Sequence, residues 1–344
     1  MRKYILLFTL VIFGIPLFAQ DDYVLMWSDE FNSEAIDTQK WSFETGGTGW
    51  GNKELQFYTA RSENAYIKDG KLIISALKED YQGKSYTSAR LITKDKAFVK
   101  YGKIEARIKL PQGKGTWPAF WMMPQESVYG SWPRSGEIDI MEHVGSDPTM
   151  ISYAVHTQQK NGSKGNNWYS KIYPGETVEQ NFHDYSIEWL EDRIVYSFDG
   201  EKQVTLWNNL LGDSNTWPFD QNFFIIINIA IGGNMGGTVD DGIFNSPVQM
   251  EVDYVRIYQK TSSSISQTEA DKIKIATNTI QRDVRIQGLE KPATISLMDM
   301  SGKGIMQLSA DSADLTIDAA LLQKGVYVLK IDQQGEISTH KIII

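Results

Sequence analysis

The sequence predicts an all-β protein, in which a β-sandwich is followed by a smaller all-β domain. Residues 22–259 consist of short alternating apolar and polar runs, turn residues separate these runs, and no long stretch has a helical period of 3.6 residues. Similar runs resume at about residue 273, beyond a polar segment. A chain of 344 residues is long enough for two domains.

The beginning of the chain has the features of a secretory signal peptide. Arg2 and Lys3 precede an apolar run at 4–18, and Ala19 lies where cleavage would occur. The run is too short and wrongly flanked for a stable membrane span. We therefore expect residues 1–20 to be removed on export. The chain contains no cysteine, so its domains must be stable without disulfides, which a core of this size allows.

The main domain is predicted to span residues 21–260. Several of its segments show the alternation of strands, and Asp199-Gly200 is a strong signal for a hairpin turn. Many short strands of this kind favour a β-sandwich. The strand segments are 71–76, 102–108, 185–189, 193–198 and 223–228.

A polar run rich in Ser predicts a linker at residues 261–272. Residues 273–344 alternate again, and strands are predicted at 293–299, 324–331 and 341–344. This second domain is therefore expected to be small and all-β.

Three acids lie within an apolar, strand-like segment. Glu137, Asp139 and Glu142 are separated only by Ile and Met, and acids are rarely buried without a partner. In a regular strand Glu137 and Asp139 would share one face and Glu142 would point away. A one-residue β-bulge after Asp139 would return Glu142 to that face. The resulting row of acids suits a retaining glycosidase, which needs two carboxyls about 5–5.5 Å apart.

Composition narrows the choice of ligands. The formal net charge of −9 makes nucleic acid an unfavourable partner. The 10 Trp residues suit a sugar-binding site, although large aromatics also fill β-sandwich cores. The sequence contains no Cys/His cluster for a transition metal. We expect no cofactor in catalysis.

The acid motif and its flanks resemble glycoside hydrolase family 16, and its laminarinase-like β-glucanases most closely. The motif is WPRSGEIDIME at 132–142. Six further blocks match in the family's order: WSDEFN at 27–32, GWGNKELQFY at 49–58, YTSAR at 86–90, GTWPAFW at 115–121, NIAIGGN at 228–234 and VDYVRIY at 252–258.

The resemblance implies a jelly roll whose concave sheet forms the substrate cleft. It makes Glu137 the nucleophile and Glu142 the acid/base, with Asp139 between them holding the local charge balance. Glu142 must then be protonated at rest, and we expect the charge of Glu137 to raise its pKa. The extra residue between Asp139 and Glu142 matches the bulged form of the motif, which laminarinase-like members have.

The resemblance also implies residues that contact the sugar. Trp117, Trp121 and Trp132 are expected to stack on sugar rings, and a core role suits Trp121 nearly as well. Further expected contacts come from Asn52, Arg90 and His156. For Arg90 a surface salt bridge is the alternative, and for His156 a purely structural role.

Family members often carry one structural Ca²⁺. The matching oxygen ligands here are the Glu30 carboxylate, the Gly70 carbonyl and Asp253. Such an ion would stabilise the fold and take no part in bond cleavage.

Residues 273–344 resemble the C-terminal sorting domain of the type IX secretion system. The resemblance rests on the length, a Gly-x-Tyr strand and a basic-apolar tail. It implies the secretion machinery as a partner and a secreted or cell-surface location. The alternative is a small accessory or carbohydrate-binding module.

Together these observations predict a secreted, monomeric endo-β-1,3-glucanase that acts on β-glucan by double displacement. A family member acting on mixed-linkage β-glucan or a marine galactan is the first alternative. A non-catalytic glucan-recognition protein on the same fold usually lacks the catalytic glutamates, which are present here. A surface adhesin is suggested only by the C-terminal segment.

Overall fold

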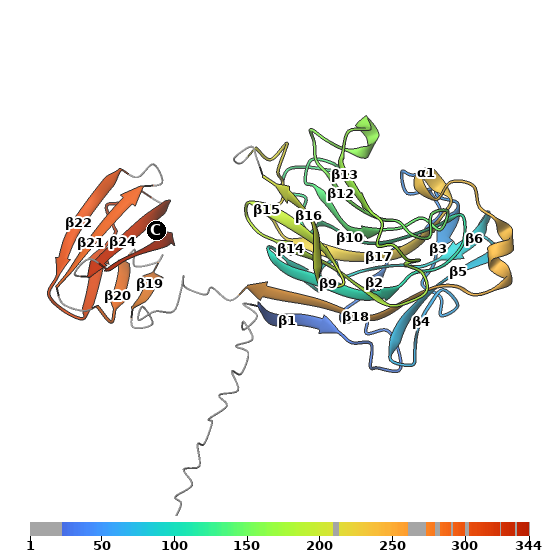
Figure 1. Ribbon diagram of the computed structural model, residues 1–344, viewed down its shortest axis with the longest axis horizontal. Coiled ribbons are helices and arrows are strands. Elements are labelled where there is room, and N and C mark those ends of the chain that lie inside the picture. Colours follow the sequence, from blue (N-terminus) through green and yellow to red (C-terminus); the bar gives the residue numbers. More distant parts are fainter. Residues whose placement is uncertain are drawn as a thin grey trace, which may run out of the picture. The chain divides into compact units, whose positions relative to one another are not determined.

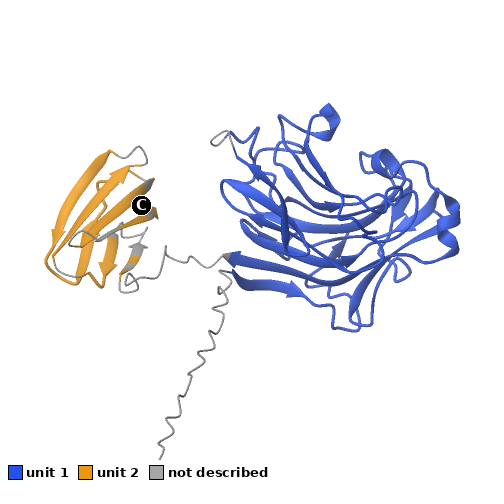
Figure 2. Cartoon of the chain, in the orientation of Figure 1, with its two compact units in different colours: residues 1–261 blue, residues 262–344 orange. Residues whose placement is uncertain are grey.

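The structure, a computed structural model, consists of two compact units, residues 1–261 and 262–344 (Figure 2). The predicted signal peptide at 1–20 and the predicted linker at 261–272 lie outside the described residues. No helix in the described part is long and apolar enough to cross a membrane. The structure describes residues 23–208, 213–260, 273–278, 283–289, 292–299, 303–323, 325–333 and 336–343.

The described residues of the first unit form two large, mainly antiparallel sheets and only short helices (Figure 1). One sheet contains β1 (Tyr23–Asp29), β3 (Gln56–Tyr58), β4 (Ala65–Lys68), β5 (Lys71–Tyr81), β6 (Lys84–Ser88), β9 (Gly102–Lys109), β14 (His183–Trp189), β15 (Arg193–Phe198), β16 (Glu201–Trp207) and β18 (Val248–Lys260). Its strand order is β16-β15-β14-β9-β18-β5-β6-β3, with β1 beside β18 and β4 beside β5, and the β3–β6 pair is parallel.

The other sheet carries the three acids. It contains β2 (Ser42–Phe43), β7 (Arg90–Ile92), β8 (Phe98–Val99), β10 (Thr116–Pro124), β11 (Glu137–Glu142), β12 (Ile151–His156), β13 (Trp168–Ile172) and β17 (Phe223–Ile231). Its order is β13-β12-β11-β10-β17-β7-β2, with β8 beside β17. The helices are η1 (Gly162–Lys164), α1 (Gly233–Gly236) and η2 (Asp241–Asn245).

Strand alternation decides which residues form the core between the sheets. On β10, Phe120 and Met122 are fully buried in the main core, whereas Trp117 and Trp121 point to the opposite face of the sheet. Every residue of β17 is buried, because its second face is also covered by apolar neighbours, including Trp121. Burying one such large side chain contributes roughly 1.5–3 kcal/mol.

The predicted β-bulge in the acid-bearing strand is confirmed. Glu137, Ile138 and Asp139 pair in register with β12, and the register then shifts before Glu142. Against β10 the shift leaves Ile140 as the extra residue. Ile140 and Met141 both point into the core, although they are consecutive, so Glu142 returns to the face of the other two acids.

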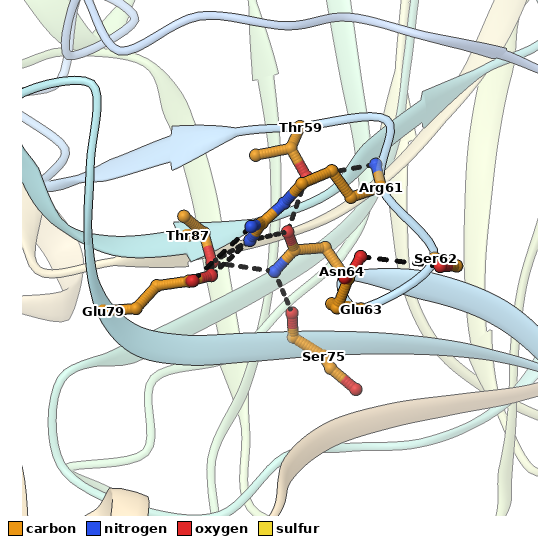
Figure 3. Close-up of polar contacts among 8 residues, drawn as sticks. All are labelled: Thr59, Arg61, Ser62, Glu63, Asn64, Ser75, Glu79 and Thr87. Atoms are coloured by element: carbon orange, nitrogen blue, oxygen red, sulfur yellow. Dashed lines mark hydrogen bonds and ion pairs between the residues drawn. The ribbon is translucent and has the colours of Figure 1, made fainter.

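A polar cluster fixes the loop that follows β3 (Figure 3). Arg61 forms an ion pair with Glu79, and the buried Asn64 donates to the Ser75 carbonyl at 3.1 Å and to the Thr87 hydroxyl at 2.9 Å. These contacts bind the loop to β5 and β6.

The second unit is a small β-structure with its own apolar core. One sheet has the order β19-β20-β23 and the other β22-β21-β24-β25. The bounds are β19 (Lys274–Asn278), β20 (Asp283–Gln287), β21 (Ala293–Asp299), β22 (Gly304–Ala310), β23 (Asp314–Asp318), β24 (Val326–Gln333) and β25 (Glu336–Ile343). The predicted fold class, a β-sandwich followed by a small all-β unit, is confirmed.

Candidate active site

The structure places all three acids on the face of the β11 sheet that points away from the core. We call this the site face. Cross-strand register extends the same face over the neighbouring strands: Glu142 lies opposite Ala119, which lies opposite Asn228, which lies opposite Arg90. The site face therefore collects polar and aromatic residues from strands that are far apart in the sequence.

Glu137 is the most accessible of the acids and is bound by an indole. Trp132 donates its Nε1–H to the Glu137 Oε2 at 2.5 Å. The His156 Nε2 lies 3.9 Å from the Glu137 Oε1. A hydrogen bond such as that from Trp132 stabilises an ionised carboxylate and fixes its orientation. Glu137 is thus fixed with one oxygen on the Trp132 indole and the other toward His156.

Glu142 is buried and accepts a hydrogen bond from the Trp117 Nε1 at 3.1 Å. Burial raises the pKa of Glu142 to about 7, and the charge of Glu137 adds to this effect, while His156 and the Trp117 hydrogen bond oppose it. The sequence predicted a raised pKa and attributed it to Glu137. The structure makes burial the larger cause.

Asp139 lies between the two glutamates and is almost inaccessible to solvent. Burial and the charge of Glu137 hold its pKa well above the usual range, although a hydrogen bond with His156 acts in the opposite direction. The His156 Nε2 lies 3.4 Å from the Asp139 Oδ2. Asp139 therefore holds a proton more readily than an exposed aspartate does.

His156 faces the acids from β12, directly opposite Glu137. The backbone N–H of Gly162 donates to its Nδ1 at 2.9 Å, which places the proton of the neutral ring on Nε2, toward Asp139. Burial lowers the pKa of His156, but the hydrogen bond to Asp139 and the charges of the acids outweigh it and raise the pKa to about 9. The hydrogen bond from Gly162 opposes protonation of the ring, because a protonated Nδ1 cannot accept a hydrogen bond.

The three predicted stacking tryptophans differ in accessibility. Trp132 is 40% exposed, donates to Glu137, and has its ring centroid 5.8 Å from that of His156. Trp117 is only 9% exposed and packs with Met150 and Ala230, so it acts on the site through its N–H to Glu142. Trp121 is partly buried, with the guanidinium of Arg90 over its ring.

Arg90 and Asn52 are both held by protein partners. The Arg90 guanidinium lies 4.6 Å from the Trp50 ring centroid and 4.7 Å from that of Trp121, and its Nε is 2.5 Å from the Glu44 carboxylate. Asn52 donates from Nδ2 to Glu54 at 3.3 Å. Contacts of these two residues with sugar stay predictions.

Two polar residues of the site face were not among the sequence predictions. Asn228 on β17 accepts the Trp121 N–H at 2.7 Å. Tyr169 on β13 pairs with Ala154, is 39% exposed, and interacts with Ser152 and electrostatically with Glu142. Alternation along these strands could have assigned both to this face, but only once their pairing partners were known.

Two of the three predicted calcium ligands have cationic partners in the structure. Arg256 donates to both Glu30 oxygens, at 2.9 and 2.7 Å, and the Asp253 carboxylate lies 3.5 Å from Arg107. Both carboxylates thus pair with arginines, and no catalytic step uses a calcium ion. The ion stays a prediction, which the melting temperature with and without EDTA tests.

The second unit matches a known type of export domain. Residues 269–344 match the family model of a secretion system C-terminal sorting domain. This match indicates export by type IX secretion, which confirms the predicted extracellular location.

The first unit has close relatives of established family. The chain is 47% identical to a β-glucanase of Rhodothermus marinus, over 68% of this chain and 85% of that protein. It is 40% identical to glucan endo-1,3-β-glucosidase A1 of Niallia circulans, over 69% of this chain but only 38% of that longer protein.

A solved structure agrees with these relatives. The laminarinase from Rhodothermus marinus has 46% sequence identity and a TM-score of 0.66, covering 69% of this chain and 97% of that one. Residues 51–256 match the family model of glycosyl hydrolases family 16. With the three acids aligned on one sheet face, the chain belongs to glycoside hydrolase family 16.

Proposed function

We propose that the protein is an endo-β-1,3-glucanase that hydrolyses its substrate with retention of anomeric configuration. The observation that carries this proposal is the contrast between its two glutamates. Glu137 is partly exposed and accepts a hydrogen bond from the Trp132 indole, whereas Glu142 is buried with a pKa of about 7. Two carboxyls in opposite protonation states are what double displacement needs.

The first step forms a covalent glycosyl-enzyme. The Glu137 carboxylate attacks the anomeric carbon, and the bond to the leaving glycosidic oxygen breaks. Glu142 donates its proton to that oxygen, so the shortened chain leaves as a neutral alcohol. Asp139, whose pKa is raised by burial, stays neutral beside Glu137 and does not compete for the anomeric carbon.

The second step uses the change of charge produced by the first. The charge of Glu137 raises the pKa of Glu142. Conversion of Glu137 to the glycosyl ester removes that charge, so the pKa of Glu142 falls. The ionised Glu142 then takes a proton from water, the oxygen of that water attacks the anomeric carbon, and the bond to Glu137 breaks. Two inversions give net retention, and both glutamates return to their starting forms.

The choice of β-1,3-glucan as substrate rests on the named relatives and on the aromatic residues near the acids. The exposed face of Trp132 next to Glu137 suits an apolar sugar face. We expect turnover of laminarin by the purified mature chain to exceed that of agarose and carrageenan by orders of magnitude, with lichenan as the mixed-linkage comparison. Initial rates of reducing-sugar release measure this, and faster release from agarose than from laminarin contradicts the proposal.

The pH dependence follows from the raised pKa of Glu142. The free enzyme needs this group protonated, so kcat/KM should fall as the pH rises through about 7. Stability should also fall as the pH rises. Glu142 keeps its proton in the folded state at pH values where the unfolded chain has lost it, so the free energy of unfolding decreases between about pH 4.5 and pH 7. A kcat/KM that is level up to pH 9 would be inconsistent with this assignment.

A separate prediction concerns the sorting domain. Deleting residues 262–344 should leave catalysis unchanged, because every acid of the site lies in the first unit. In the native host the truncated enzyme should stay in the periplasm, where cell fractionation detects it. A carbohydrate-binding module predicts the reverse, namely normal export with weaker binding to insoluble glucan.

We also propose that the protein acts as a monomer, which its sedimentation behaviour would test.

A further inference from the structure

Glu54 is a buried carboxylate that the catalytic steps do not use. It is 5% exposed, and three neutral side chains donate to it. Gln56 and Tyr58 donate to Oε2 at 2.6 and 3.2 Å, and Asn52 donates to Oε1 at 3.3 Å. Two of these donors belong to β3, and Asn52 belongs to the preceding loop. An ionised carboxylate can only accept, so it fixes the direction of all three bonds.

A chain of hydrogen bonds with one direction connects Glu54 to the site face. The Trp121 Nε1 donates to the Asn228 Oδ1 at 2.7 Å, and the Asn228 Nδ2 donates to the Tyr58 Oη at 3.0 Å. Tyr58 then donates its only proton to Glu54. Each donor points toward the carboxylate, and such chains polarise their members cooperatively. The amide of Asn228 therefore has one orientation, with its oxygen toward Trp121.

Backbone contacts hold Glu54 against the end of β17. Glu54 forms an isolated bridge with Gly232, and the Leu55 N–H donates to the Ile231 carbonyl at 2.9 Å. The Asn234 N–H donates to the Asn52 carbonyl at 2.8 Å. A Cβ on Gly233 would lie 2.9 Å from that carbonyl oxygen, so only glycine allows this approach without a shift. The backbone of Glu54 is thus anchored independently of the donors to its side chain.

We propose that Glu54 is a positioning residue for substrate binding, which orients Asn52 and Trp121 at the same time. This inference rests on the proposed function, since both residues are predicted sugar contacts. Trp121 in turn supports the Arg90 guanidinium on its ring. One buried charge therefore sets the geometry of a loop residue and a strand residue that would contact the same sugar chain.

The test is Glu54→Gln, which keeps the shape but replaces one acceptor by an NH₂ group that faces donors. KM for laminarin should rise by about 10-fold or more, the scale of one lost hydrogen bond to a charged group, while kcat changes by less than about threefold. The pH profile should stay unchanged, because neither catalytic glutamate touches Glu54. Tyr58→Phe breaks only the connection to Trp121 and should give part of the same rise in KM.

Glu79→Gln is the matched control, because Glu79 also anchors a polar cluster and that cluster contains none of the predicted sugar contacts (Figure 3). It should lower the melting temperature and leave KM unchanged. A folded Glu54→Gln variant with wild-type KM on laminarin, or one that matches Glu79→Gln in every respect, overturns the inference.

A second measurement separates this inference from the choice of substrate. The Trp121 indole N–H resonance, assigned with Trp121→Phe, should shift in Glu54→Gln and not in Glu79→Gln. If the wild type is inactive on laminarin, the proposed function fails, and this resonance still decides whether Glu54 orients Trp121. An unchanged resonance in Glu54→Gln overturns the inference whatever the substrate is.

Discussion

Glu137→Gln should lower kcat on laminarin by about 10⁴-fold or more, the scale seen when a nucleophile is removed, while the protein stays folded. The amide keeps the shape of the side chain, and its oxygen can still accept from Trp132. It cannot form the glycosyl ester, so double displacement stops at its first step. Steady-state rates measure the loss, and an unchanged circular dichroism spectrum shows that the fold is intact.

The stereochemistry of the wild-type product provides the accompanying check. NMR of the first product released from a β-glucan should show the β-anomer before mutarotation. An α-configured first product would rule out the covalent intermediate on Glu137. Residual activity in Glu137→Gln within tenfold of the wild type would do the same.

The activity of Glu142→Ala on laminarin should be about 10²–10⁴-fold lower than that of the wild type, since the leaving oxygen no longer receives a proton. An aryl glycoside with an activated leaving group avoids that requirement, so its glycosyl-enzyme should still form. Azide, which needs no general base, should then attack that intermediate and restore turnover. The product should be a β-glycosyl azide, because Glu137 and azide each invert the centre once.

Glu137→Ala is the matched control for azide rescue. There azide can only replace the missing nucleophile, so a single displacement should give the α-glycosyl azide. Mass spectrometry and NMR distinguish the two products. If both variants give the same anomer, the roles assigned to the two glutamates are wrong.

Local patterns predicted the strand segments and the acid row well, because these depend on alternation within one short stretch. The bulge followed from the requirement that Glu137, Asp139 and Glu142 share a face. The causes of the pKa shifts could not be predicted in this way. The burial that raises the pKa of Glu142 comes from neighbouring strands. No pattern around position 142 reports how deeply those neighbours cover it.

Contacts between distant segments were also beyond local patterns. Glu30 and Arg256 are 226 residues apart, and their pairing depends on β1 lying beside β18. Glu30, which the sequence offers as a calcium ligand, therefore has a guanidinium partner that no local pattern predicts. Likewise, Arg90 lies between Trp50 and Trp121 only because three separate segments meet.

The bulge at Ile140 makes the length of the catalytic strand adjustable. A residue removed from a regular strand turns every later side chain to the opposite face, which would exchange core for solvent. Removing Ile140 has a different effect, because this residue has no cross-strand partner. Glu142 would keep its place opposite Ala119, and the shortened strand would alternate regularly with all three acids still aligned. At this one position an active site can lose a residue and keep its chemistry.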